Sequence, residues 1–121
     1  MKNVRKSIVY DKSFNFAIKV VNTYKLLAQD KKEYILSKQL LRAGTSIGAN
    51  IREGLEGQSS KDFISKLSIS LKEATETEYW IELLLATNYL DGKKARDLLD
   101  DLSEIIKILN AIIKTKKQNS M

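Results

Sequence analysis

A row of mainly apolar and small residues with alternating steps of four and three runs without a slip through the second half of the chain. Its positions are Phe63, Leu67, Ser70, Ala74, Thr77, Ile81, Leu84 and Asn88. This spacing places the row on a single face of a helix, and the chain has no proline to interrupt one. The row predicts a helix over about residues 60–90. A turn at Gly57 and Gln58 precedes it, and Ser59 with Asp62 forms a capping box.

The same spacing predicts two helices in the first half of the chain. One covers about residues 13–29, with Asp11 or Ser13 as its N-cap. Its apolar row comprises Phe14, Ala17, Val21, Tyr24 and Ala28, with Phe16, Val20 and Leu27 beside it. The next helix covers about residues 33–56, and its row comprises Leu36, Leu40, Ala43 and Ile47. Because Gly44 and Gly48 carry no side chain, we expect another helix to approach this backbone closely.

A fourth helix is predicted over about residues 93–114. Its apolar row comprises Ala95, Leu98, Leu102, Ile105, Leu109 and Ile112. Asp91 and Gly92 are expected to end the preceding helix, with Gly92 just past its C-terminus, and the polar tail 116–121 is expected to fray. Four amphipathic helices with short connections predict one all-α domain over residues 1–121, an up-down-up-down antiparallel four-helix bundle.

The chain has neither cysteine nor histidine, and these absences exclude several kinds of site. A thiolate nucleophile, a Cys/His zinc site, a His- or Cys-ligated haem and a Ser-His-Asp triad all need those residues. The dinuclear carboxylate bundles need Glu-x-x-His, and a disulfide scaffold needs cysteine. No cofactor and no metal are therefore expected. No signal peptide or membrane span is apparent either, so the expected compartment is the cytoplasm.

A polar layer is predicted between the second and third helices. If the turn lies at Gly57 and Gln58, the antiparallel register places Arg42 opposite Glu73, with Glu76 one turn away. Ser46 and Asn50 follow Arg42 at helical spacing on the apolar side of the second helix. We therefore expect Arg42, Ser46, Asn50 and a glutamate of the third helix to form a partly buried layer that fixes helix register.

Four glutamates, Glu73, Glu76, Glu78 and Glu82, gather on the third helix. Paired carboxylates can act as general acid and base or bind Mg²⁺, but such sites also need a pocket and further ligands. A solvated acidic face is the favoured interpretation.

The positive charge is concentrated in the first part of the chain. The net charge is +6, with +8 over residues 1–72 and −2 over residues 73–121. An up-down bundle brings both chain ends to one pole, where seven basic residues would gather: Lys2, Arg5, Lys6, Lys12, Lys114, Lys116 and Lys117. A basic pole favours a polyanion such as RNA or DNA, and an ordinary solvated surface is the alternative.

The third and fourth helices carry more apolar side chains than one seam needs. The extra positions are Ile64, Leu71, Leu85, Leu99, Ile106 and Ile113. Such a wide stripe either fills a thick monomer core or faces another subunit, and we favour a homo-oligomer.

Two stretches of the sequence resemble a known family. Residues 41–54, LRAGTSIGANIREG, resemble the Arg-Ala-x-x-Ser-Ile-x-x-Asn-Ile-x-Glu motif of the bacterial four-helix-bundle proteins, also called 23S rRNA intervening-sequence proteins. Residues 61–64, KDFI, and 70–84, SLKEATETEYWIELL, resemble the same family's third helix. The prolines often found between the first two helices and before the motif's Asn are missing here.

The resemblance implies a four-helix bundle that assembles as a ring-like homopentamer, a gene sometimes found in insertions within 23S rRNA genes, and no established catalytic activity. A related branch, the accessory variability determinant proteins of diversity-generating retroelements, forms a similar basic pentamer that works with a reverse transcriptase and nucleic acid. The motif residues Arg42, Ser46, Asn50, Glu53, Glu73 and Glu76 would hold the bundle and its assembly together.

Three hypotheses follow in order of preference. The first is a non-enzymatic, oligomeric scaffold that binds RNA or DNA through its basic surface, either alone or together with a protein partner. The second is a protein–protein adaptor that docks through its apolar rows. The third, well behind, is an enzyme that uses the carboxylates of Glu73, Glu76 and Glu78.

Overall fold

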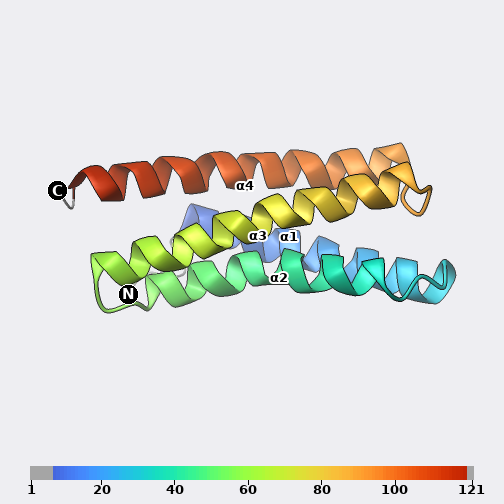
Figure 1. Ribbon diagram of the computed structural model, residues 1–121, viewed down its shortest axis with the longest axis horizontal. Helices are drawn as coiled ribbons and strands as arrows, with labels where there is room; N and C mark the ends of the chain where they lie inside the picture. Colours follow the sequence, from blue (N-terminus) through green and yellow to red (C-terminus); the bar gives the residue numbers. More distant parts are fainter. Residues whose placement is uncertain (1–6, 120–121) are drawn as a thin grey trace.

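The computed structural model describes residues 7–119, which form four α-helices and no strand (Figure 1). The helices are α1 (Ile8–Lys25), α2 (Leu36–Leu55), α3 (Ser60–Ala86) and α4 (Gly92–Asn119), and a π-helical turn, η2 (Leu26–Asp30), continues α1. Successive helices run antiparallel, and α1 packs against α4 as well as α2. The predicted up-down-up-down four-helix bundle is confirmed. Within the described residues, no helix is long and apolar enough to cross a membrane.

The start and the core face of α1 differ from the prediction. The helix begins at Ile8, because the Ser7 Oγ accepts a hydrogen bond from the Tyr10 N–H at 3.1 Å, and neither Asp11 nor Ser13 caps it. The buried residues of α1 and η2 are Val9, Ser13, Phe16, Val20 and Leu27. The row expected to face the core lies outside it: Phe14 is 54% exposed, and Ala17, Val21, Tyr24 and Ala28 are only partly buried. The first helix carries two apolar rows, and periodicity alone does not tell which one meets the core.

The close approach expected at the small residues of α2 is confirmed. A Cβ added to Gly44 would lie 2.8 Å from the Val20 Cγ2, and one added to Gly48 would lie 3.0 Å from the Ser13 Oγ. Val20 and Ser13 are both completely buried. The missing side chains of α2 therefore select the row of α1 that enters the core.

The connection from η2 to α2 depends on Glu33, which is 9% exposed. The second helix begins at Leu36 and not at Glu33. The Glu33 carboxylate accepts hydrogen bonds from the backbone N–H groups of Ile35, Leu36 and Ser37 at 3.1, 2.9 and 2.7 Å. Burial raises the pKa of Glu33, but these N–H groups outweigh it and hold the pKa below its ordinary value. Glu33 thus satisfies the otherwise unpaired donors of the first turn.

The turn between α3 and α4 also differs from the prediction. The third helix ends at Ala86, and Asn88 rather than Gly92 adopts the left-handed conformation, with φ 68°. Gly92 opens α4, and the Asp91 Oδ1 accepts a hydrogen bond from the Lys94 N–H at 2.8 Å, as an N-cap does. The fourth helix continues to Asn119, so residues 116–119 of the tail are helical.

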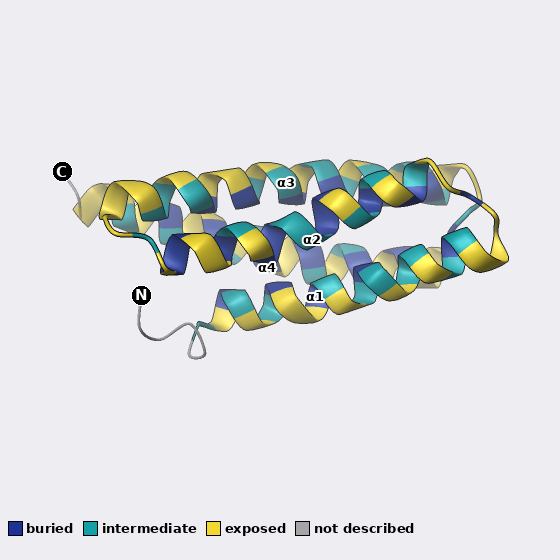
Figure 2. Cartoon of the chain, turned by 90° about the horizontal axis from the view of Figure 1, so that it is seen from below, coloured by how far each residue is buried: buried dark blue, intermediate teal, exposed yellow. Residues whose placement is uncertain are grey.

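Buried residues lie on the inward-facing sides of all four helices (Figure 2). Five of the six extra apolar positions of α3 and α4 belong to this core or pack against it: Ile113 is buried, and Leu71, Leu85, Leu99 and Ile106 are partly buried. Ile64 is also partly buried. Two polar residues of the α3 row are also fully buried. The Ser70 Oγ donates to the Ile47 carbonyl of α2 at 2.8 Å, and the Thr77 Oγ1 donates to the Glu73 carbonyl at 2.7 Å. These hydrogen bonds allow both residues to lie in an apolar seam.

Replacement of Gly44 by Ala should destabilise the protein. The new Cβ would overlap both methyl groups of Val20, and overpacking costs about 1–3 kcal/mol, of which helix propensity returns about 1 kcal/mol. Gly92→Ala is the matched control, because nothing lies within 4 Å of its added Cβ. Urea unfolding followed by circular dichroism should show a loss for Gly44→Ala and little change or a gain for Gly92→Ala. Equal effects would contradict the close packing of α1 on α2.

The stability of the protein should depend on the ionisation of Glu33. Because the folded pKa of Glu33 lies below its ordinary value, the charged carboxylate stabilises the fold above about pH 4.3, and this stabilisation is lost as the pH falls through the folded pKa. Glu33→Gln should lower the free energy of unfolding at pH 7 and flatten its decline below pH 5. Glu56→Gln is the control, because the Glu56 side chain is exposed. Urea unfolding between pH 7 and pH 3 measures the difference, and an unchanged decline in Glu33→Gln contradicts this role.

Candidate functional site

Arg42, in the first half of α2, lies against two carboxylates of α3. Its Nη1 lies 3.2 Å from the Glu73 Oε1, and its Nη2 pairs with the Glu76 Oε2. The Gln39 Oε1 accepts from the Arg42 Nε at 3.3 Å. The Glu76 Oε2 also accepts from the Trp80 Nε1 at 2.9 Å. The register expected between α2 and α3 is therefore found, and these five residues form one hydrogen-bonded group, called the Arg42 cluster below.

The Arg42 cluster is partly open to solvent. The side chains of Arg42, Glu73 and Glu76 are 49%, 19% and 35% exposed. The Trp80 N–H, and after it the charge of Arg42, hold the pKa of Glu76 below its ordinary value. Carboxylates held ionised by an arginine are poor general acids. The arrangement is suited to holding α2 against α3.

The remaining residues of the predicted layer lie elsewhere. The Ser46 Oγ donates to the Ala43 carbonyl at 2.9 Å, and the Asn50 Nδ2 donates to the Ser46 carbonyl at 2.8 Å, so both bond to their own helix. Glu53 pairs with Lys66 of α3 at 2.9 Å. A single layer that includes Ser46 and Asn50 is thus not found, because nearby carbonyls of α2 satisfy both side chains.

The acidic residues of α3 do not form a metal site. No group of three or more Asp, Glu, His or Cys residues in the described part of the chain could hold a metal ion. Glu73 and Glu76 face Arg42. Glu78 and Glu82 make no ion pair or side-chain hydrogen bond with the described residues. The four glutamates thus divide into a pair that faces Arg42 and a pair without such a partner among the described residues.

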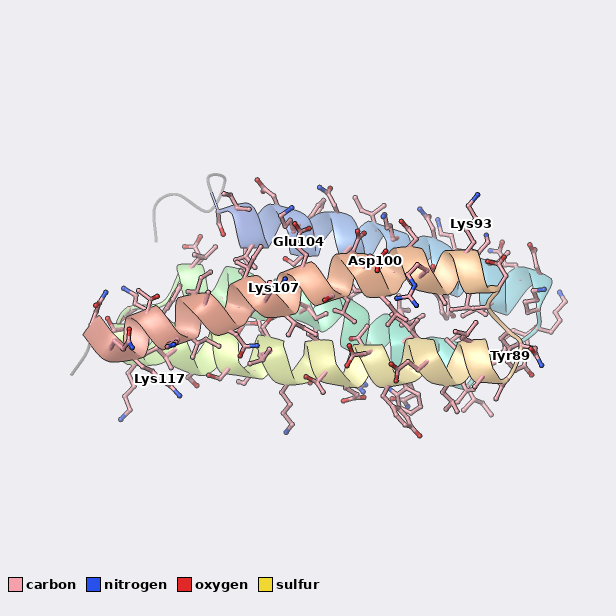
Figure 3. The ribbon with its side chains drawn as sticks, turned by 90° about the horizontal axis from the view of Figure 1, so that it is seen from above. Tyr89, Lys93, Asp100, Glu104, Lys107 and Lys117 are labelled. Carbon is pink, nitrogen blue, oxygen red and sulfur yellow. The ribbon has the colours of Figure 1, made fainter. Side chains whose placement is uncertain are left out.

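The described start of α1 and the end of α4 lie at the same end of the bundle (Figure 1), called the basic end below. Lys114, Lys116 and Lys117 occupy the last turns of α4, and Figure 3 shows Lys117 at the tip. Among the residues described, none of these three lysines has a carboxylate partner. Lys12 pairs with Glu104 at 3.1 Å, so its charge is partly neutralised. Lys2, Arg5 and Lys6 lie outside the described residues.

Ion pairs join α1 to α4 and set their relative position. Lys19 pairs with Asp101 at 2.6 Å and with Asp97 at 3.0 Å, and the hydrogen bonds to Asp101 and then to Asp97 raise the pKa of Lys19. Lys12 is level with Glu104, and α1 and α4 run antiparallel. The first residue of α1, Ile8, is therefore level with about residue 108 of α4. The last turns of α4 extend about 16 Å farther, at 1.5 Å per residue. We call this segment, residues 109–119, the α4 extension.

Two neighbouring grooves lie between the α4 extension and the start of α3. One is lined by Phe63, Ala111, Ile112, Thr115, Lys116 and Asn119. The other follows the α2–α3 turn and is lined by Gly54, Leu55, Gly57, Gln58, Ser59, Ser60, Phe63 and Lys116. Phe63 and Lys116 line both grooves, and the Lys116 Nζ lies 5.4 Å from the centre of the Phe63 ring.

The outer side of α1 exposes large apolar side chains. Ile8, Phe14 and Ile18 are 68%, 54% and 47% exposed. Tyr10 lies beside Phe14, and the Arg52 Nη1 donates to the Tyr10 hydroxyl at 3.1 Å. Of these three, only Phe14 belongs to the apolar row that was expected to face the core, and we call Ile8, Phe14 and Ile18 the outer α1 row.

Several residues of these sites were missed from the sequence. Trp80 follows Glu76 by four residues on α3, a spacing that brings side chains together on a helix and could have indicated the bond. Gln39 precedes Arg42 by three residues and gives the same signal. Nothing in the sequence brings Phe63 to Lys116, because that contact depends on how far α4 extends.

The chain is similar over most of its length to known proteins. Residues 5–111 match the family model of the 23S rRNA-intervening sequence protein. A crystal structure of a protein with unknown function from the S23 ribosomal protein family of Bacteroides thetaiotaomicron VPI-5482 is 54% identical. The two structures agree with a TM-score of 0.87, and 88% of this chain and 96% of that chain are covered. No curated protein matches the chain. The match to the family model confirms the resemblance drawn from the motifs, and the chain belongs to the 23S rRNA-intervening sequence protein family.

Proposed function

We propose that the protein is a non-enzymatic, homo-oligomeric helical scaffold that binds RNA or DNA through the phosphate backbone. The observation that carries the proposal is the group of lysines on the α4 extension. Lys114, Lys116 and Lys117 project from less than two turns of one helix, and the described residues provide no carboxylate for them. Lysines in this state are free to neutralise phosphates, and the release of counterions then drives binding.

The distribution of paired and unpaired charges supports the choice of this end. The acidic residues of α4 that face α1 are occupied by Lys12 and Lys19. Beyond Glu104, α4 has basic residues and no acidic ones. The proposed contact set keeps the three lysines of the α4 extension and gives Lys12 a lesser part, while Lys2, Arg5 and Lys6, which lie outside the described residues, stay predicted contacts.

Assembly is the second part of the proposal, and the outer α1 row supports it. Three large apolar side chains that are each about half exposed or more leave a surface that a second copy could cover. The family resemblance implies five copies in a ring, and we adopt that number. A ring would repeat the lysines of each α4 extension, and avidity then raises the affinity for a long polyanion.

A protein–protein adaptor is the second candidate function, and the same outer α1 row favours it. If another protein covers Phe14 and its neighbours, binding is driven by apolar burial and changes little with salt. Phosphate binding weakens steeply between about 50 and 200 mM salt. Salt dependence thus distinguishes the two functions.

Removal of the three lysines should weaken nucleic-acid binding without loss of the fold. The variant Lys114→Gln/Lys116→Gln/Lys117→Gln should lose affinity for a labelled RNA or DNA and reduce the slope of log affinity against log salt by about 2–3.

Arg42→Ala should affect the fold rather than nucleic-acid binding, because it leaves Glu73 and Glu76 without their cation. It should lower thermal stability or oligomer mass more than affinity. Fluorescence anisotropy over a salt series tests both variants, and unchanged RNA affinity in the triple variant refutes the proposed contact.

The outer α1 row should control the mass of the protein in solution. Size-exclusion chromatography with light scattering should give a multiple of the 13.8 kDa chain mass. Phe14→Glu should lower that mass, since a charge would replace a half-exposed ring. Ile35→Glu is the control, because Ile35 is 74% exposed at the other end of the bundle. A wild-type monomer at micromolar concentration contradicts the assembly.

A further inference from the structure

Phe63 is an aromatic side chain held at the basic end on a fixed backbone. It lies in the first turn of α3, where the Ser59 Oγ accepts from the Asp62 N–H at 3.1 Å and the Ser59 carbonyl accepts from the Phe63 N–H at 3.0 Å. Its ring is partly buried, packs against the core and lines both grooves beside the α4 extension. One part of the ring is thus anchored, and another part is open to a ligand.

The surroundings of Phe63 are both apolar and basic. Ala111 and Ile112 of α4 continue the apolar surface, and Thr115 and Asn119 add polar groups at its margin. The residues that line the two grooves lie within segments 54–63 and 111–119, and together with the flanking residues 53 and 64–66 these segments contain five lysines and three carboxylates. The lysines are Lys61, Lys66, Lys114, Lys116 and Lys117, and the carboxylates are Glu53, Glu56 and Asp62. One carboxylate, that of Glu53, is already paired with Lys66.

An existing contact shows that the Phe63 ring accepts a cation on its face. The Lys116 Nζ lies 5.4 Å from the ring centre, within the range of a cation–π interaction. The side chain of Lys116 is long and flexible. When a flat group such as a base stacks on the Phe63 ring, Lys116 can turn away from the ring and toward a neighbouring phosphate. An aromatic ring with a lysine over its face and further lysines nearby is an arrangement suited to binding one base and its phosphate.

We propose that the nucleic acid bound at the basic end is single-stranded, and that one unpaired base stacks on Phe63 while Lys116 contacts an adjacent phosphate. This inference rests on the function proposed above. In a duplex, each base is stacked on its neighbours and paired, so its face is closed to a protein ring. In a single strand, the face of any base is open, and stacking then tolerates many sequences.

Competing affinities for single and double strands test the proposal. Fluorescence anisotropy with a labelled 12-nucleotide oligouridine, a 12-nucleotide oligothymidine and a 12-base-pair duplex should be measured at one fixed salt concentration. The wild-type protein should bind the two single strands more tightly than the duplex. Phe63→Leu, which keeps an apolar side chain and removes the ring, should weaken single-strand binding about tenfold and leave duplex binding unchanged. Phe63→Trp should restore single-strand binding.

Two controls separate loss of stacking from other effects. Tyr79→Leu removes an aromatic ring that is 56% exposed on the distal half of α3, and it should not change either affinity. Circular dichroism and light scattering should show that Phe63→Leu keeps its helix content and mass. Equal weakening of single-strand and duplex binding, or no weakening, overturns the stacking proposal but leaves phosphate binding by the lysines intact. Absence of any binding by the wild type at low salt overturns both proposals.

Discussion

The bundle depends on how closely α1 lies against α2. Gly44 and Gly48 leave room for Val20 and Ser13, and a Cβ at either glycine would come within 3.0 Å of them. Because α1 has an apolar row on each of two sides, this contact also decides which row becomes the surface of the molecule. The half-exposed Phe14 is a consequence of the same packing. The absence of side chains on one helix therefore determines both a seam of the core and the outer α1 row.

Much of the fold could be predicted from the sequence, because it depends on spacing. The unbroken row of α3 and the cap at Ser59 locate the α2–α3 turn, and the antiparallel register then brings Arg42 to Glu73. The helix ends were less predictable. At Glu33 and Asp91, a side-chain carboxylate accepts from backbone N–H groups that, in a helix begun earlier in the chain, would donate to carbonyls of the preceding turn. Whether these N–H groups bond to the carboxylate or to a backbone carbonyl depends on tertiary packing, and the apolar periodicity of the sequence does not reveal that packing.

The candidate site was predictable only where two helices face each other along a regular seam. Ser46 and Asn50 had the spacing of a shared layer, but short polar side chains reach the carbonyls of their own helix first. The contact of Phe63 with Lys116 depends on α4 continuing through polar residues after Ile113, its last buried position. Basic residues near a helix C-terminus favour that continuation, because they interact with the partial negative charge of the helix end. The local sequence, which is polar, gave the opposite expectation.

The last residues of the α4 extension, 114–119, belong to the surface that is proposed to bind a partner and not to the core that keeps the protein folded. Residues 114–119 contribute nothing to the buried core, whereas Ile113 immediately before them does. Substitutions in these last turns can therefore alter charge, length or the shape of the grooves at little cost in folding free energy. The charge and shape of this tip are thus uncoupled from the packing of the helices beneath it.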